Sequence, residues 1–254
     1  ALDRGSSRRL WPSGRLLHRA RPMKPHRLLA EARTPDGACL TLHEHDGSYC
    51  IRLGGRELMH SKAAASELSL GEVGTARLAR GKPARVLIGG LGLGFTLRSV
   101  LDRTGTEVNV EVAELLPAIV AWNREHLAVL NGTLLNKGRV MVRVGDVFDL
   151  VEGAVPANYD AILLDIDNGP SAMVQAANAR LYDARGLRLL AAALAPGGRL
   201  VVWSAGEDRA FEQRLAKAGF RVETVPVKIH AGARQAAGRL FVGDKMMEPR
   251  GARR

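Results

Sequence analysis

The sequence predicts an α/β fold in which a mostly parallel sheet follows a small β module. Two observations support this prediction. From residue 85 onward, buried-strand patterns alternate with helical patterns, which is how parallel strands are connected through helices on both faces of a sheet. Before residue 62 the pattern is period-two and rich in turn residues, as in antiparallel strands. With 254 residues, 46% of them hydrophobic, the chain can bury a large core without disulfide or metal staples.

The predicted β module covers residues 28–62 and contains a hairpin. Asp46-Gly47 stands between two alternating segments, and this dipeptide favours a two-residue hairpin turn. A turn there puts the apolar residues of both strands on one face, with Leu40 opposite Leu53 and Leu42 opposite Ile51. Cys39 and Cys50 then face other residues, so we expect two free thiols.

The predicted α/β domain covers residues 63–244. It begins with a helix over 64–80 that two glycines weaken. Buried strands are expected at 85–90, 107–114, 139–144, 159–165 and 199–204, and helices at 96–103, 117–130, 180–195 and 208–218. Two late strands, at 221–229 and 239–243, have no helix between them, so we expect the sheet to end in an antiparallel pair.

Most of the net charge of +11 lies in the two tails. Residues 1–27 hold eight Lys or Arg against one Asp, and residues 245–254 hold four against one Glu. We interpret the tails as flexible basic extensions, with nucleic-acid binding as the open alternative. No apolar run reaches the ~18 residues of a membrane span, and the N-terminal arm lacks the apolar segment of a secretory signal. We therefore expect a cytoplasmic protein with no membrane attachment.

A glycine loop connects the first buried strand of the α/β domain to its helix. Its pattern is Gly90-x-Gly92-x-Gly94. The dinucleotide fingerprint G-x-G-x-x-G would need a glycine where Phe95 stands. The observed spacing is instead typical of S-adenosylmethionine (SAM) enzymes. The alternative is that these glycines only allow close packing of strand and helix.

Three acidic residues end consecutive predicted strands beside this loop. Glu114, Asp146 and Asp165 follow the second, third and fourth strands of the α/β domain. Ligands bind at the carboxyl ends of parallel strands, so we expect the three carboxylates to form one rim. There Glu114 can accept both hydroxyls of a ribose, and Asp146 the amino group of an adenine.

In these stretches the chain resembles the spermidine synthase-like polyamine aminopropyltransferases, which have the class I SAM-dependent methyltransferase fold. The resemblance covers about residues 53–204, and its most specific segments are RVLIGGLGLGFTLRSVL, VEVAELLPAIV, RVGD, YDAILLDIDNGP and LYDARGLRLLAAALAPGGRLVV. It implies a Rossmann-like domain with a seven-stranded sheet, SAM or decarboxylated SAM as the donor, an amine acceptor and a homodimer.

The resemblance also implies roles for single residues. The donor contacts are Gly90, Gly92 and Gly94 in the loop, Glu114 on the ribose, Asp146 on the adenine, and Asp165. Asp165 is also the catalytic residue, because it matches the first Asp of the family's D-x-x-D loop beside the attacking amine. The acceptor contacts are Asp167, Asn168 and Glu72. Apart from the resemblance, Tyr182 is a candidate aromatic contact for the ammonium groups of the acceptor, and the alternative is that it only packs in the core.

Several positions depart from the family pattern. Asn168 replaces the second Asp of the D-x-x-D loop, with Asp167 adjacent to it. The family's Y-H-E motif matches Leu70-Gly71-Glu72, without its Tyr and His. Leu91 or Leu93 stands where the glycine loop normally has an acid, and Met59 stands where a donor-contacting Gln is expected. The departures concern the acceptor and the charged tail of the donor, while the nucleoside contacts are kept.

Three functions follow from this pattern. The first is an enzyme that transfers an aminopropyl group to an amine, in which Asp165 positions the amine; direct proton abstraction would require burial to raise its pKa. The second is a SAM-dependent methyltransferase acting on a small amine or RNA. The third is a non-catalytic nucleoside-binding scaffold. No metal is expected, because the histidines show no ligand spacing with the cysteines.

Overall fold

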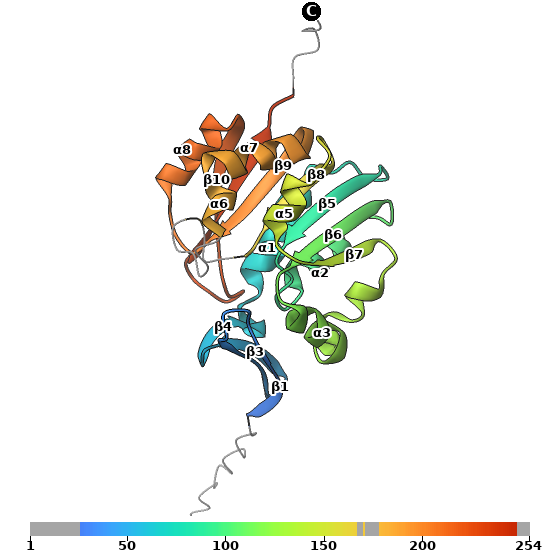
Figure 1. The fold of residues 1–254 in the computed structure, drawn as a ribbon, viewed down its shortest axis with the longest axis vertical. Helices are drawn as coiled ribbons and strands as arrows, with labels where there is room; N and C mark the ends of the chain where they lie inside the picture. Colours follow the sequence, from blue (N-terminus) through green and yellow to red (C-terminus); the bar gives the residue numbers. More distant parts are fainter. Residues whose placement is uncertain (1–25, 167–169, 171–177, 248–254) are drawn as a thin grey trace, which may run out of the picture.

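The computed structural model describes residues 26–166, 170 and 178–247, which form a small antiparallel sheet and a larger α/β unit (Figure 1). The small sheet has the strand order β1-β2-β3-β4. Its strands are β1 (Arg27–Arg33), β2 (Cys39–His45), β3 (Ser48–Leu53) and β4 (Arg56–His60). The β module is therefore larger than the predicted hairpin, because an outer strand pairs with each of its two sides.

The predicted hairpin register is confirmed. Leu40 pairs with Leu53 and Leu42 with Ile51, and all of these except Leu53 are buried. The turn has Asp46 at φ 50° and Gly47 at φ 73°, which is the left-handed conformation that a two-residue hairpin requires. Cys50 faces His43 across the strands, and both cysteines are free thiols as predicted.

The larger sheet has seven strands in the order β10-β11-β9-β8-β5-β6-β7. Its strands are β5 (Ala84–Gly89), β6 (Val108–Glu114), β7 (Val140–Val144), β8 (Tyr159–Leu164), β9 (Leu194–Ser204), β10 (Phe220–Val227) and β11 (Gly238–Lys245). The first five are parallel, and β11 pairs antiparallel with both β9 and β10. The predicted mostly parallel sheet with an antiparallel end is therefore confirmed.

Helices cover both faces of this sheet, as Figure 1 shows. They are α1 (Ala65–Thr75), α2 (Phe95–Arg103), α3 (Pro117–Glu125), α4 (Ala128–Asn131), α5 (Val147–Glu152), α6 (Ala179–Tyr182), α7 (Ala184–Ala193) and α8 (Arg209–Lys217). Two 3-10 turns lie at Ser61–Ala63 and Leu134–Asn136. The sequence did not predict α5, and it predicted α3 with α4, and α6 with α7, as single helices.

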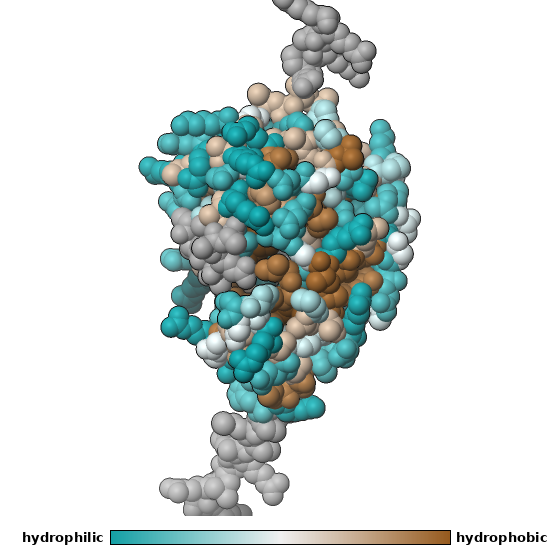
Figure 2. All heavy atoms as spheres, in the orientation of Figure 1, coloured by the Kyte–Doolittle hydropathy of each residue, from teal (hydrophilic) through white to brown (hydrophobic). Residues whose placement is uncertain are grey.

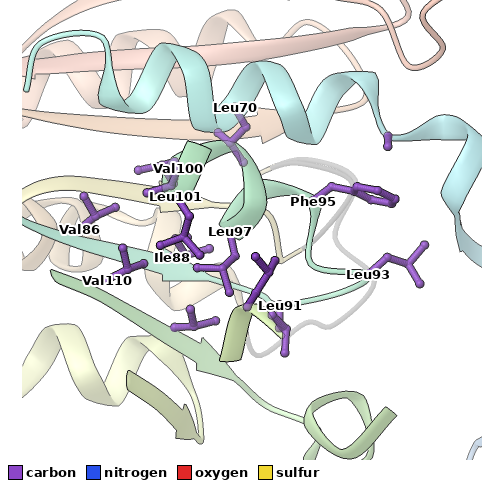
Figure 3. Close-up of a cluster of buried hydrophobic side chains, with 14 of the residues drawn as sticks. Leu70, Val86, Ile88, Leu91, Leu93, Phe95, Leu97, Val100, Leu101 and Val110 are labelled. Atoms are coloured by element: carbon purple, nitrogen blue, oxygen red, sulfur yellow. The ribbon is translucent and has the colours of Figure 1, made fainter. Parts of the chain in front are cut away.

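Two buried clusters show that β5 carries side chains to both faces. Val86 and Ile88 belong to the cluster under α1, α2 and α3, of which Figure 3 shows part. Leu87, between them, belongs to the second cluster, under α5, α7 and α8. Alternation along a strand accounts for this division. Both faces of the central strand are thus buried, as expected for a parallel sheet with helices on each side.

The glycines of α1 place this helix close to its neighbours. A Cβ atom at Gly71 would lie 2.5 Å from Cβ of Ser99 on α2, and one at Gly74 would lie 2.7 Å from the side chain of Leu163 on β8. These glycines weaken the helix intrinsically, but they allow its backbone to approach α2 and the sheet. The first turn of α1 is thereby fixed beside the loop that follows β5.

No helix in the described ranges combines the length and apolar character needed to cross a bilayer. Most of the predicted basic arm (1–27) and of the basic tail (245–254) lies outside the residues that the structure describes.

Candidate functional site

A cavity of about 520 Å³ lies between the small sheet and the carboxyl ends of the parallel strands. Its wall includes Met59 from β4, the glycine loop after β5, and the ends of β6 and β8. The predicted donor residues Gly90, Gly92, Glu114, Asp146 and Asp165 all line it. Leu115, also in its wall, is 38% exposed, and Figure 2 shows apolar side chains gathered on this side of the molecule, between α3 and α5.

The glycine loop is held in a left-handed backbone conformation. Gly90 has φ 89° and Gly92 has φ 51°, values that residues with a Cβ rarely adopt. A Cβ atom at Gly90 would also collide with the carbonyl oxygen of Asp165. Gly94 was predicted to contact the donor, but it is not among the residues that line the large cavity. It precedes the first residue of α2 and has φ 86°.

Two asparagines that the sequence analysis did not identify support this loop. The side-chain amide of Asn123 donates to the carbonyl of Gly92 at 2.8 Å, and that of Asn131 donates to the carbonyl of Leu93 at 2.5 Å. Buried carbonyls need such partners, and the two amides fix the direction in which the loop faces the cavity. No local motif marked either residue, because the contacts form between distant segments.

Glu114 anchors the same loop from the other side. One carboxylate oxygen accepts the N–H of Leu91 and the other accepts the N–H of Leu116, each at 2.9 Å. Burial raises the pKa of Glu114, while these backbone hydrogen bonds oppose that change. The backbone N–H groups of Gly92 and Leu115 also act on this carboxylate, so ribose hydroxyls would share its oxygens with the loop backbone.

Asp146 precedes α5 and already has two partners. It accepts the N–H of Phe148 at 2.8 Å, and its other oxygen forms an ion pair with Arg180 at 2.7 Å. The Arg180 guanidinium lies 4.2 Å from the centre of the Phe148 ring. An adenine amino group would therefore have to share Asp146 with Arg180. The sequence analysis did not identify Arg180.

Asp165 follows the last residue of β8 and lines the cavity. A second carboxylate, Glu67 of α1, lines the same cavity. The backbone N–H of Asp165 donates to the carbonyl of Gly89 at 2.9 Å, which fixes its place beside the glycine loop. Burial and the nearby charge of Glu67 raise the pKa of Asp165 to about 7, against a hydrogen bond from Thr96 that lowers it. Burial also raises the pKa of Glu67.

Two predicted acceptor residues are not where the prediction placed them. Glu72 faces away from the cavity, is exposed, and pairs with Arg103 at 2.8 Å. Tyr182 is buried and is not part of the cavity lining. Its ring packs edge-on against that of Phe211, with the ring centres 5.6 Å apart. On α1 it is Glu67, five residues before Glu72, that enters the cavity. Asp167 and Asn168 lie outside the described residues.

The cavity is strongly acidic. Five carboxylates line it, and no Lys or Arg does so in the part of the chain that the structure describes: the acids are Glu57, Glu67, Glu114, Asp146 and Asp165. The undescribed residues between 167 and 177 also include no Lys or Arg in sequence. His60 and His230 are the only basic types in the described lining. Such a cavity favours cationic ligands.

No metal site is formed by the described residues, because no three His, Cys, Asp or Glu side chains among them gather closely enough to hold an ion.

Comparison with known proteins supports the same fold. No family model matches the chain. A polyamine aminopropyltransferase from Mycobacterium tuberculosis is 36% identical over 119 residues, which are 46% of this chain and 22% of that protein. The chain therefore matches only about a fifth of the length of this relative.

Solved structures of spermidine synthases share the architecture. The enzyme from Thermotoga maritima superposes with a TM-score of 0.68 at 16% identity, covering 88% of this chain and 74% of the other. A spermidine synthase in complex with the transition-state analogue AdoDATO gives 0.67 at 17% identity with the same coverage. These likenesses show the Rossmann-like methyltransferase fold, and the sequence match links it to aminopropyltransferases.

Proposed function

We propose that this chain is an aminopropyltransferase that binds decarboxylated SAM in the 520 Å³ cavity and transfers its aminopropyl group to an amine. The observation that carries the proposal is the acidic lining without Lys or Arg in the described residues. Decarboxylated SAM carries a sulfonium and an ammonium, both positive. Intact SAM adds a carboxylate, which this acidic wall repels, and the described lining offers no Lys or Arg to pair with it. The donor is a substrate here, and no metal is required.

The placement of the lining residues supports the proposed donor contacts. Glu114 accepts the two ribose hydroxyls, and its backbone partners hold it in place. Asp146 takes the adenine amino group beside Arg180. The flat surface of the glycine loop, with no Cβ at Gly90 or Gly92, lets the nucleoside approach the backbone.

Asp165 is the residue we assign to the acceptor amine. The amine nitrogen attacks the carbon beside the sulfonium, the N–C bond forms, the C–S bond breaks, and its electron pair returns to sulfur as a neutral thioether. The amine must lose one proton, and a carboxylate with a pKa of about 7 accepts it far better than an ordinary aspartate. Asp165 is partly buried and lines the cavity with Glu67, and this placement supports proton abstraction as its role.

A transfer assay tests the proposal. The protein is incubated with decarboxylated SAM and small diamines, and products are identified by mass spectrometry. We expect methylthioadenosine together with an amine enlarged by one aminopropyl group, and a loss of at least about 100-fold in turnover for Asp165→Asn with little change in donor affinity. Equal loss of turnover and affinity would contradict the acceptor role of Asp165.

The other two functions are outcomes of the same assay. Methylated amine or RNA formed from intact SAM would support the methyltransferase. Nucleoside binding with no transfer from either donor would support the scaffold.

Three further predictions remain proposals. The resemblance implies a homodimer, the sequence pattern favours a cytoplasmic location, and the charge of the basic tails leaves nucleic-acid binding as an alternative. Removing residues 1–27 should abolish salt-sensitive RNA retention if the arm binds RNA.

A further inference from the structure

Glu67 is held in the cavity by the packing of α1 on α2. The hydroxyl of Ser99 donates to the carbonyl of Leu68 at 2.6 Å, next to the close approach at Gly71. The hydroxyl oxygen of Thr96, on the first turn of α2, lies 3.5 Å from the carbonyl oxygen of Glu67. The first turn of α1 is thus tied to the start of α2, and Glu67 is directed to the wall that also holds Asp165.

The side chain of Thr96 links the two acids. It hydrogen-bonds to Asp165 and lies beside the backbone of Glu67. The hydroxyl of Ser66 donates to one carboxylate oxygen of Glu67 at 2.7 Å, which leaves the other oxygen available to the cavity. Both carboxyl groups therefore have a hydroxyl partner, line the same cavity and share contacts with Thr96.

The charged and titratable groups that line the cavity with Asp165 come from several elements. They are Glu57 and His60 of β4, Glu67 of α1, Glu114 of β6, Asp146 before α5 and His230 after β10, and Asp167 follows two residues later in the sequence, outside the described residues. No described lining residue is a Lys or Arg that could neutralise two adjacent carboxylates. Two neighbouring carboxylates in such surroundings do not both ionise readily.

We propose that Glu67 is a positioning residue for the reaction, and that Glu67 and Asp165 hold one proton between them at neutral pH until an acceptor amine binds. The identity of the reaction rests on the proposed function, whereas the shared proton does not. The raised pKa values of both carboxyl groups agree with this arrangement.

The proton balance of acceptor binding follows. An incoming ammonium compensates the second negative charge, so the pair releases its shared proton to solvent. One proton then passes from the ammonium nitrogen to the pair, leaving a neutral amine with its lone pair free to attack. The net result is one proton released to solvent for each acceptor that binds to a protonated pair.

The test is a carboxyl NMR titration of protein labelled with ¹³C at aspartate, without donor or acceptor, with Asp165→Asn used to assign the signal. In wild type we expect the Asp165 signal to titrate near pH 7. In Glu67→Gln its midpoint should fall by about one pH unit or more, because the neighbouring charge is gone. Glu72→Gln is the matched control, since Glu72 lies on the same helix but faces solvent, and it should leave the midpoint unchanged.

An unchanged midpoint in Glu67→Gln, or a wild-type midpoint near 4, would overturn the proposal. If Glu67→Gln does not fold, Glu67→Asp provides the second variant. It keeps a charge at this position and should keep the raised midpoint, and an ordinary midpoint there would count against the proposal. The titration needs no activity, so its failure is distinct from failure of the transfer assay.

Calorimetric titration with a diamine, in buffers of different ionisation enthalpy, gives the functional readout. We expect about half a proton released per acceptor in wild type at pH 7, where the pair is about half protonated, and almost none in Glu67→Gln, whose remaining Asp165 is mostly ionised. Equal proton release in both proteins would contradict the shared proton.

Discussion

Asp165 and Asp244 are both aspartates near the end of a strand, yet their surroundings are opposite. Asp244, on β11, is held by Arg199 with bonds of 2.8 and 3.1 Å, by Arg77 at 2.8 Å and by Arg221 at 3.1 Å. Burial acts to raise the pKa of Asp244, but the three arginines outweigh it and hold the pKa at about 2. Asp165 shares its wall with acids, and its pKa is about 7.

The difference shows how partners assign a role to the same side chain. Asp244 joins strands β9, β10 and β11 to the end of α1 through its arginines, and Arg199 also donates to the carbonyl of Val73 on α1 at 3.0 Å. The Asp244 carboxylate stays charged at any physiological pH and stabilises the antiparallel end of the sheet through its ion pairs. Asp165 can gain or lose a proton near neutral pH, as a group that accepts a proton from an amine must.

The largest expected effect is on Asp244. Asp244→Ala leaves three guanidinium groups without their common carboxylate, so the free energy of unfolding should fall by about 3–5 kcal/mol. Urea denaturation at pH 7 measures this loss. Arg221→Gln is the control, because its side chain is 73% exposed and its removal should cost less than about 1 kcal/mol. A loss below 1 kcal/mol for Asp244→Ala would show that the cluster does not stabilise the sheet.

Asp165→Asn should increase the free energy of unfolding, whereas Asp244→Ala decreases it. The folded protein holds a proton on Asp165 up to about pH 7, against an ordinary value of 3.8, so the wild type loses stability as the pH rises from about 4 to about 7. Asparagine stays neutral, so at pH 8 the variant should be more stable than the wild type. The gain should vanish below about pH 4. Melting temperatures at pH 4 and 8 measure it, and a destabilised variant at pH 8 would contradict the account.

The pH dependence of Asp244 gives a second contrast. Its folded pKa is below its ordinary value, so its stabilisation is present above about pH 4 and is lost as the pH falls through about 2. The contribution that depends on this ionisation is about 2 kcal/mol at pH 7. Denaturation of wild type and Asp244→Asn from pH 7 to 2 should show the two stabilities converging, and a constant difference would contradict the pKa assignment.

The smallest expected effect is on Glu72. Its pair with Arg103 is exposed on both sides, so Glu72→Gln should change the free energy of unfolding by less than about 0.5 kcal/mol and leave turnover unchanged. Chemical denaturation and the transfer assay measure both. A marked loss of turnover would restore the acceptor role that the sequence predicted for Glu72.

The parts of the fold that local pattern determines could be predicted. The alternation around Asp46-Gly47 defined the hairpin register, and the order of strands and helices defined the parallel sheet. Because parallel strands end at one edge, Glu114 and Asp165 could be placed in one site. The outer strands β1 and β4 were missed, since exposed and charged side chains along them interrupt the apolar alternation.

The parts that depend on packing between distant segments could not be predicted. Which face of α1 enters the cavity is decided by the close approach at Gly71, and helical periodicity in this segment does not distinguish Glu67 from Glu72. Arg180 and the asparagines that support the glycine loop likewise come from segments far along the chain. Tyr182 resembles an acceptor contact in sequence, but its ring packs in the second core cluster.

The central claim is that an acidic wall selects a fully cationic nucleoside donor. Isothermal titration of the same protein with decarboxylated SAM and with intact SAM, at pH 7.5 and low salt, tests it most directly. The account predicts that the decarboxylated form binds at least about tenfold more tightly, a difference of about 1.4 kcal/mol, and that added salt narrows the gap. Tighter binding of intact SAM, or no binding of either compound, would contradict it.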